Sequence, residues 1–245
     1  MLKKIKSKIR KHLGITQILE NQEQLLIQNK ELLNSTVFNS SIFDCDWLKY
    51  KCFSPRGWAV DYGFLYTLFR VLNEMRPKSI IEFGLGQSSK LIYQYVNFFK
   101  ETNAITYEHD LNWIEFFKSS IGSNYPINIK QVELTNIIYK GETTLSYKNI
   151  IQEFGIQKYD LIVVDGPFGS DRYSRSQVLE LSQENLADIF CIIIDDYDRK
   201  GEKETVQELM SILNKKNIKY LFTIYTGIKQ HLLLCSENLK FLTSL

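Results

Sequence analysis

Residues 79–89 carry the feature that most limits how this chain can fold. Ser79–Phe83 is an apolar run typical of a buried strand, and Gly84-Leu85-Gly86 forms a tight turn directly after it. Residues 90–100 then repeat apolar side chains at helical spacing. A strand, a Gly-x-Gly turn and a helix N-terminus together leave backbone amides open to a ligand. The sequence therefore predicts a ligand site at the end of this strand.

Candidate strands and helices alternate from this unit to the end of the chain. The expected strands are Ser79–Phe83, Ala104–Tyr107, Ile127–Val132, Asp160–Val164, Cys191–Ile194, Tyr220–Tyr225 and His231–Cys235. Helices are expected from Ala59 to Met75 and around Tyr93, Phe116, Ile150, Leu179 and Leu209. Only five residues join the last two strands, which is too short for a parallel crossover. We therefore predict an α/β fold with a doubly wound, Rossmann-like, seven-stranded sheet that ends in an antiparallel hairpin.

The N-terminal part differs in composition from this domain. Residues 1–35 are expected to form a helical extension, residues 36–58 a connector and residues 59–245 the folded domain. Residues 1–12 hold six Lys or Arg residues and no acid, and apolar residues then recur near heptad spacing, with Gln22 and Asn29 between them. Three interpretations stay open: a helix packed on its own domain, self-association, or contact with an anionic membrane surface.

Charge and cysteine content limit the kinds of partner that the chain is expected to bind and the cell compartment in which it is expected to lie. The net charge is +2, so with six positive charges in residues 1–12 the remainder carries −4, and no nucleic-acid partner is expected. The four cysteines form no Cys-x-x-Cys pair, which is typical of reduced thiols in the cytoplasm. No run of 18 apolar residues is present, so a membrane-spanning segment is not expected.

The glycine turn and the acids around it resemble the cofactor motif of class I S-adenosylmethionine-dependent methyltransferases. The family pattern, an acid followed by Gly-x-Gly, is matched by Glu82, Gly84 and Gly86, while Ser88 replaces a third glycine. Glu108 matches the acid at the end of the second strand. The resemblance covers the chain from about residue 60 onward. It implies that these residues bind S-adenosylmethionine, with Gly84 and Gly86 beside its methionine part and Glu108 on its ribose.

Three further acids end the next pair of buried strands. Asp165 opens an Asp-Gly-Pro turn, and Asp195 and Asp196 stand in Ile-Asp-Asp-Tyr. These segments resemble metal-dependent O-methyltransferases of macrolide sugars, and the Asp-Gly-Pro turn resembles plant glucuronoxylan O-methyltransferases. The resemblance implies a carbohydrate hydroxyl as the acceptor.

The physical argument agrees with such an acceptor, because a sugar hydroxyl needs a base or a cation that lowers its pKa before it can attack. Three clustered carboxylates suit Mg²⁺. We therefore expect Asp165, Asp195 and Asp196 to hold a divalent cation, with Asp165 or Asp196 taking the proton. The alternative is that Asp165 caps its turn and that the pair are ordinary strand-end acids.

Arg172, Tyr173 and Arg175 follow on the same loop and are candidate substrate-binding residues. A guanidinium matches a carboxylate or phosphate in a bidentate way, which would suit an acidic sugar. A surface pair at a helix start is the alternative. Trp47, Trp58, Tyr62 and Phe168 offer either a stacking surface for a sugar or core packing.

Together these features predict a cytoplasmic O-methyltransferase that acts on a glycan or a glycan precursor, held at the inner face of a membrane if residues 1–12 contact lipid. Two alternatives stay open. One is a small-molecule methyltransferase, and the other is a non-catalytic assembly module of a surface-polysaccharide complex that keeps the fold.

Overall fold

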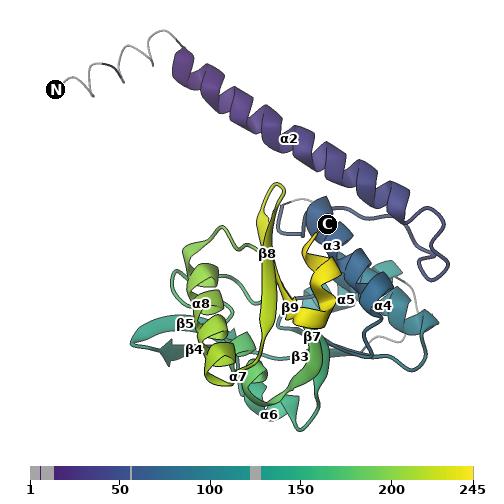
Figure 1. Ribbon diagram of the computed structural model, residues 1–245, viewed down its shortest axis with the longest axis vertical. Coiled ribbons are helices and arrows are strands. Elements are labelled where there is room, and N and C mark those ends of the chain that lie inside the picture. Colours follow the sequence, from purple (N-terminus) through teal and green to yellow (C-terminus); the bar gives the residue numbers. More distant parts are fainter. Residues whose placement is uncertain (1–5, 7–13, 56, 122–127, 245) are drawn as a thin grey trace.

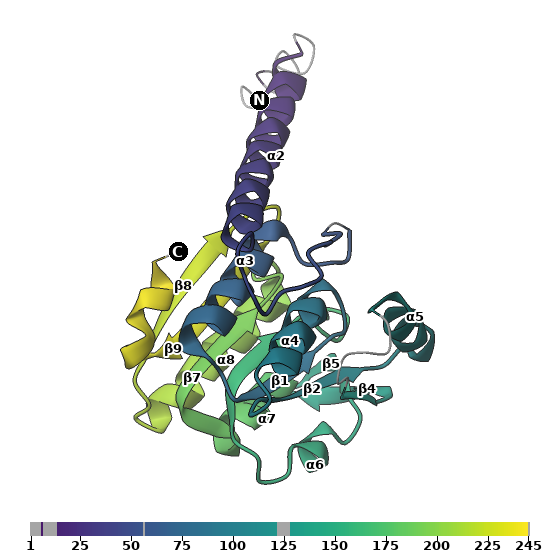
Figure 2. The ribbon, with the colours of Figure 1, turned by 90° about the vertical axis from the view of Figure 1, so that its right-hand side faces the viewer.

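A seven-stranded sheet forms the centre of the molecule (Figures 1 and 2). The computed structural model describes residues 6, 14–55, 57–121 and 128–244. In spatial order the strands are β3 (Ile129–Gln131), β2 (Asn103–Glu108), β1 (Ser79–Phe83), β6 (Tyr159–Val164), β7 (Leu186–Ile194), β9 (Gln230–Ser236) and β8 (Tyr220–Thr226). The pairs from β3 to β7 are parallel, whereas β9 runs antiparallel to both β7 and β8. The predicted fold class is confirmed; residue 127, where the third strand was expected to start, lies outside the described residues.

Alternating side chains of the central strands build two cores, one on each face of the sheet. Leu161 and Val163 of β6 pack in the core that includes α3 and α4, whereas Ile162 and Val164 pack in the core that includes α7 and α8. The helices and short helical turns of the domain are α3 (Tyr62–Arg70), η1 (Val71–Met75), α4 (Gln87–Phe98), α5 (Leu111–Ile121), α6 (Ile150–Phe154), α7 (Gln177–Glu184), α8 (Lys200–Lys215) and η2 (Glu237–Thr243). Burial on both faces explains why the central strands read as continuous apolar runs.

A second, two-stranded sheet was not predicted from the sequence. β4 (Leu134–Tyr139) and β5 (Glu142–Tyr147) pair as an antiparallel hairpin. Lys140 and Gly141 form its turn, both with positive φ (50° and 82°), as a two-residue hairpin turn requires. A lysine at the first turn position is a weak sequence signal, so the hairpin was missed. The helix expected around Ile150 is reduced to the short α6.

The N-terminal helix ends six residues later than the sequence indicated, at Ser41 instead of residue 35. α2 (Ile15–Ser41) continues past residue 35 into the stretch expected to be an irregular connector. The reason is packing: Phe38 is fully buried, with its ring 5.3 Å from that of Phe53 and 6.4 Å from that of Phe69. The first half of α2 stands away from the body (Figure 2).

The basic stretch of residues 1–12 lies outside the described residues, apart from Lys6. Within the part that is described, no helix combines the length and the hydropathy that crossing a bilayer demands.

We expect Phe38→Ala to lower the free energy of unfolding by about 3 kcal/mol or more, because it empties a fully buried aromatic site. Val37→Ala is the matched control, since Val37 is the neighbouring residue of the same helix and is 36% exposed. Urea denaturation of both variants measures the difference. If the Phe38 variant loses no more stability than the Val37 variant, the end of α2 is not part of the folded domain.

Candidate active site

Glu82 fixes the position of the Gly84–Gly86 turn through hydrogen bonds to neighbouring elements. Its buried carboxylate accepts hydrogen bonds from the hydroxyls of Ser88 (2.6 Å), Ser89 (2.7 Å) and Thr106 (2.7 Å). It thereby joins the end of β1 to β2 and to the first turn of α4. Burial raises the pKa of Glu82 to about 7, although these three hydrogen bonds favour the charged form. The Ser88 hydroxyl donates its one hydrogen to Glu82.

The two glycines of the turn have different requirements. Gly84 has φ +93°, and a Cβ there would lie 2.9 Å from the Asp165 carbonyl carbon and the Gly166 nitrogen. Gly84 is therefore needed by the fold, because the loops after β1 and β6 touch backbone to backbone. A Cβ on Gly86 would meet no atom within 4 Å among the described residues. Gly86 thus borders open space, as a residue against which a ligand lies must do.

Glu108 ties the end of β2 to the same turn. One carboxylate oxygen accepts from the amide of Leu85 (3.0 Å), and the other accepts from the amides of His109 (2.7 Å) and Asp110 (3.0 Å). The Leu85 carbonyl in turn accepts from the indole of Trp113 (2.7 Å). These amide bonds use only part of the acceptor capacity of a carboxylate. Glu108 can therefore hold the glycine turn and still accept from a ligand hydroxyl.

The three predicted aspartates come together where β6 and β7 end. Asp165, Asp195 and Asp196 each offer a carboxylate oxygen, and these oxygens lie within 4.8 Å of one another. Parallel neighbouring strands deliver their C-terminal ends to one edge of the sheet, which is why the sequence could anticipate the cluster.

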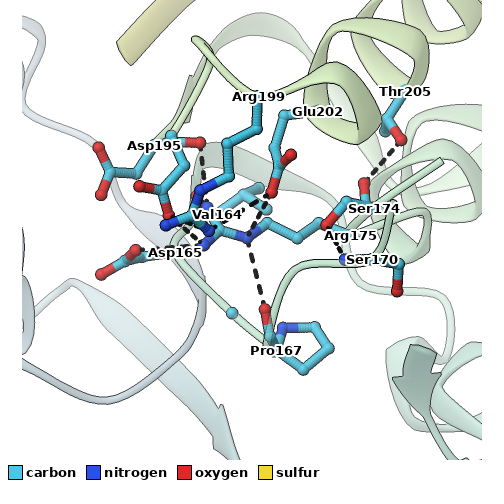
Figure 3. Close-up of polar contacts among 12 residues, drawn as sticks. Val164, Asp165, Pro167, Ser170, Ser174, Arg175, Asp195, Arg199, Glu202 and Thr205 are labelled. Atoms are coloured by element: carbon cyan, nitrogen blue, oxygen red, sulfur yellow. Dashed lines mark hydrogen bonds and ion pairs between the residues drawn. The ribbon is translucent and has the colours of Figure 1, made fainter. Parts of the chain in front are cut away.

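Arg175 occupies the centre of this group, as Figure 3 shows. Its guanidinium lies 2.7 Å from Asp196 and 3.6 Å from Asp165, and it donates to the carbonyl of Asp195 (3.0 Å). Arg175 is only 3% exposed. It is thus part of the buried frame of the site, and its guanidinium is engaged by the protein itself.

Two further cationic residues, which were not predicted from the sequence, contact the carboxylate cluster. The ammonium of Lys229, in the turn between β8 and β9, lies 3.3 Å from Asp195 and 3.4 Å from Asp196. Arg199 lies 3.0 Å from Asp196. One signal for Lys229 was present: β8 runs in the same direction as the parallel strands, so the turn after it must lie at the edge where Asp165 and Asp195 lie.

The electrostatics of the cluster favour proton transfer. Burial, and then the charge of Asp195, raise the pKa of Asp165 well above its usual value. Burial likewise raises the pKa of Asp195, although Lys229 opposes this. Burial alone would lower the pKa of Lys229, but the carboxylates outweigh it and raise the pKa overall, so the amine stays charged. The site therefore combines carboxyls of raised basicity with fixed positive charges.

The other two loop residues predicted to bind substrate make contacts elsewhere. Arg172 forms ion pairs with Glu204 (2.8 Å) and Glu142 (2.5 Å). The ring of Tyr173 packs edge-on against Tyr139, 5.1 Å away. In the described contacts neither side chain joins the carboxylate cluster.

The four aromatic residues considered for stacking divide into two pairs. Trp47 is buried in the core and Tyr62 packs against it, as the core alternative predicted. Trp58 is 84% exposed, and its ring centre lies 6.1 Å from that of exposed Phe168. The ring centre of Phe168 also lies 4.8 Å from that of half-buried His109, which follows the end of β2.

No protein-family model matches the sequence, and no curated protein matches it significantly. Several solved structures are similar in fold. An O-methyltransferase from Streptomyces achromogenes involved in tomaymycin synthesis, in complex with SAM, shares 12% identity over 73% of this chain and 82% of its own, with a TM-score of 0.49. A putative caffeoyl-CoA O-methyltransferase from Staphylococcus aureus shares 14% identity over 72% and 84% (TM-score 0.48). An O-methyltransferase from Bacillus cereus in complex with SAH shares 12% over 85% and 91% (TM-score 0.47). Likenesses this distant assign no chemistry to this chain.

The raised pKa of Glu82 predicts a specific pH dependence. The carboxyl loses its proton near pH 4.5 when unfolded but only near pH 7 when folded, so between these values the folded protein binds more protons. Wild-type stability should therefore fall relative to Glu82→Gln as the pH rises through this window, by at most about 3 kcal/mol. Urea denaturation across the window, with exposed Glu115→Gln as the control, measures it. A constant difference between wild type and Glu82→Gln would show that Glu82 titrates normally.

Proposed function

We propose that this protein is an S-adenosylmethionine-dependent O-methyltransferase. The observation that carries the proposal is the pairing of Glu108 with the glycine turn. A buried carboxylate at the end of β2 is bonded to the Leu85 amide inside the Gly84–Gly86 turn of β1. A ribose hydroxyl pair and the methionine part of the cofactor need such a carboxylate and such an open turn side by side. Glu82 and Ser88 would hold the turn in place beneath the cofactor.

The carboxylate cluster supplies the chemistry that methyl transfer to oxygen requires. The acceptor hydroxyl must lose its proton as its oxygen attacks the methyl carbon in line with the sulfur. The O–CH₃ bond forms, the S–CH₃ bond breaks with its electron pair moving to sulfur, and the proton passes to a carboxylate. We assign this base role to Asp165, whose pKa is raised, or to Asp196. Lys229, held in place by Asp195 and Asp196, would stabilise the developing negative charge on the oxygen.

The same carboxylates fit a divalent cation such as Mg²⁺. They offer hard oxygen ligands, and one oxygen of Asp195 has no hydrogen-bond partner among the described residues although it is buried. Asp165, Asp195 and Asp196 would hold the cation, which supplies a lowered pKa for a hydroxyl bound to it. Arg175 and Lys229 contact the same side chains, so the cation must compete with them.

For the acceptor, we propose a hydroxyl of a glycan or glycan precursor. A cavity of about 280 Å³ opens beside Lys229, between α2 and the turn that joins β8 to β9, and is lined by Glu31, Gly57, Ala59, Asp61, Ile228 and Lys229. The carboxylates of Glu31 and Asp61 in its lining suit a small polyhydroxylated ring, because carboxylates accept hydrogen bonds from hydroxyls. The exposed rings of Trp58 and Phe168 meet at 68°, and each would offer its own apolar face for such a ring to stack on. We also propose a cytoplasmic location, where the four free cysteines would stay reduced.

Calorimetric titration with S-adenosylmethionine tests the cofactor. We expect Glu108→Gln to weaken binding about tenfold or more, roughly 1.4 kcal/mol, because the ribose loses a charged acceptor. Gly86→Ala should fold normally but bind weakly, since its methyl group enters the space that the cofactor occupies. Gly84→Ala should lose stability instead, through its positive φ and the clash with Asp165.

Glu115→Gln, on the exposed face of α5, is the matched control and should bind as the wild type does. If folded, ligand-free wild-type protein does not bind S-adenosylmethionine, the methyltransferase proposal is wrong, and the assembly-module alternative gains support.

Titration of the full chain with MgCl₂ tests the cation separately. We expect saturable binding that Asp195→Asn weakens tenfold or more, about 1.4 kcal/mol, because it removes a buried ligand oxygen. Asp188→Asn, an exposed aspartate of β7, should leave binding unchanged. Equal loss in both variants, or no saturable binding to the wild type, would rule out the cation and leave the carboxylates acting as bases alone.

A further inference from the structure

The first half of α2 has no packing partner among the described residues. Residues 15–30 are exposed on every side of the helix, and in both views this segment projects from the body (Figures 1 and 2). A lone helix of this length is marginal in water, because most helical stability in proteins comes from packing of an apolar face. The segment therefore needs a surface to pack against.

Its exposed apolar side chains form two rows with a strict period of seven. One row is Ile18, Leu25 and Leu32, and the other is Leu19, Leu26 and Leu33. These side chains are between 50% and 66% exposed. Gln22 and Asn29 share the same period and lie between the rows, at 100° of rotation per residue. A sustained heptad period is the pattern of helices that supercoil around one another.

The two rows, with Gln22 and Asn29 between them, form one stripe that faces away from the domain to which the helix is attached. Glu31 and Phe38, which are also seven residues apart, make the contacts to the body: Glu31 accepts from the Tyr62 amide (3.0 Å) and Phe38 enters the core. Glu31 lies about 200° around the helix from Asn29. The body therefore holds one side of α2 and leaves the leucine rows of the other side free.

The polar residues of α2 favour a second copy of the chain, and not a lipid surface, as the partner of this stripe. Gln22 and Asn29 lie in the middle of the apolar stripe, where lipid would leave their amides without hydrogen-bond partners. Between residues 15 and 41 the helix carries three carboxylates and one lysine, a net −2, which an anionic membrane repels. Another α2 presents the same amides at the same level, so they can pair and set the register.

We propose that two copies of this chain associate through α2 as a coiled coil, with both leucine rows in the interface and Gln22 and Asn29 at its centre. The pairing would also steady the active-site edge. Glu31 holds the start of α3, where Asp61 accepts from the amides of Phe64 (2.8 Å) and Lys229 (3.2 Å). The same Glu31 and Asp61 line the cavity beside Lys229.

Sedimentation equilibrium of the full chain tests the proposal. We expect a mass of twice 28.8 kDa at micromolar concentration, and Leu26→Glu should raise the dissociation constant at least tenfold. Ile27→Glu is the matched control: Ile27 is the next residue, exposed and apolar, but lies off the stripe. It should stay dimeric. Circular dichroism and S-adenosylmethionine titration establish that both variants keep a folded domain.

A monomeric wild type, or equal dissociation in both variants, would overturn the proposal. So would a monomer that sediments with phosphatidylglycerol vesicles and loses this binding in Leu26→Glu, because lipid would then be the partner of the stripe. Cofactor binding is measured independently in the same samples. A failure of the dimer is therefore distinguishable from a failure of the methyltransferase proposal.

Discussion

The burial of one guanidinium organises the edge of the sheet where the proposed active site lies. Arg175 is withdrawn from water, so its charge must be matched by neighbouring acids. Asp196 and Asp165 supply that match, and the carbonyls of Val164, Asp195 and Pro167 accept further hydrogen bonds from it. These partners come from the ends of β6 and β7 and from the loop between them. The arginine therefore holds in one place the carboxylates that would otherwise repel one another.

Lys229 adds a further positive charge to the same cluster. It comes from the turn between β8 and β9, which Asp61 secures at the N-terminus of α3. The fixed charges of Arg175 and Lys229 oppose the rise in pKa that burial causes in Asp165 and Asp195, and they offset the repulsion between carboxylates at the two strand ends. Such an arrangement is in place before any ligand arrives, which is how a site stabilises charge that develops during a reaction.

On the proposed cofactor side of the site, two carboxylates make most of the contacts that fix the glycine turn. Glu82 accepts hydrogen bonds from three hydroxyls next to the glycine turn, and Glu108 accepts one from the Leu85 amide within it. Gly84 then lets the β1 loop touch the β6 loop directly. Because that contact joins the glycine turn to Asp165, the proposed cofactor and acceptor halves of the site are held at a defined separation.

Much of this could be predicted from the sequence because it depends on local pattern. Apolar periodicity located the strands of the main sheet, the short connection before His231 required the final hairpin, and strand ends placed Glu108 and the three aspartates at one edge. The tertiary structure alone decided which groups meet. Arg175 is buried among the acids, Arg172 pairs with Glu204, and Lys229 joins the carboxylate cluster. Gly84 is required by a backbone contact, whereas Gly86 borders open space. The β4–β5 hairpin likewise emerged only from the tertiary structure. The physical reason is that periodicity and chain ends are properties of neighbouring residues. Ion pairs and backbone contacts between distant segments depend instead on how two cores pack against one sheet.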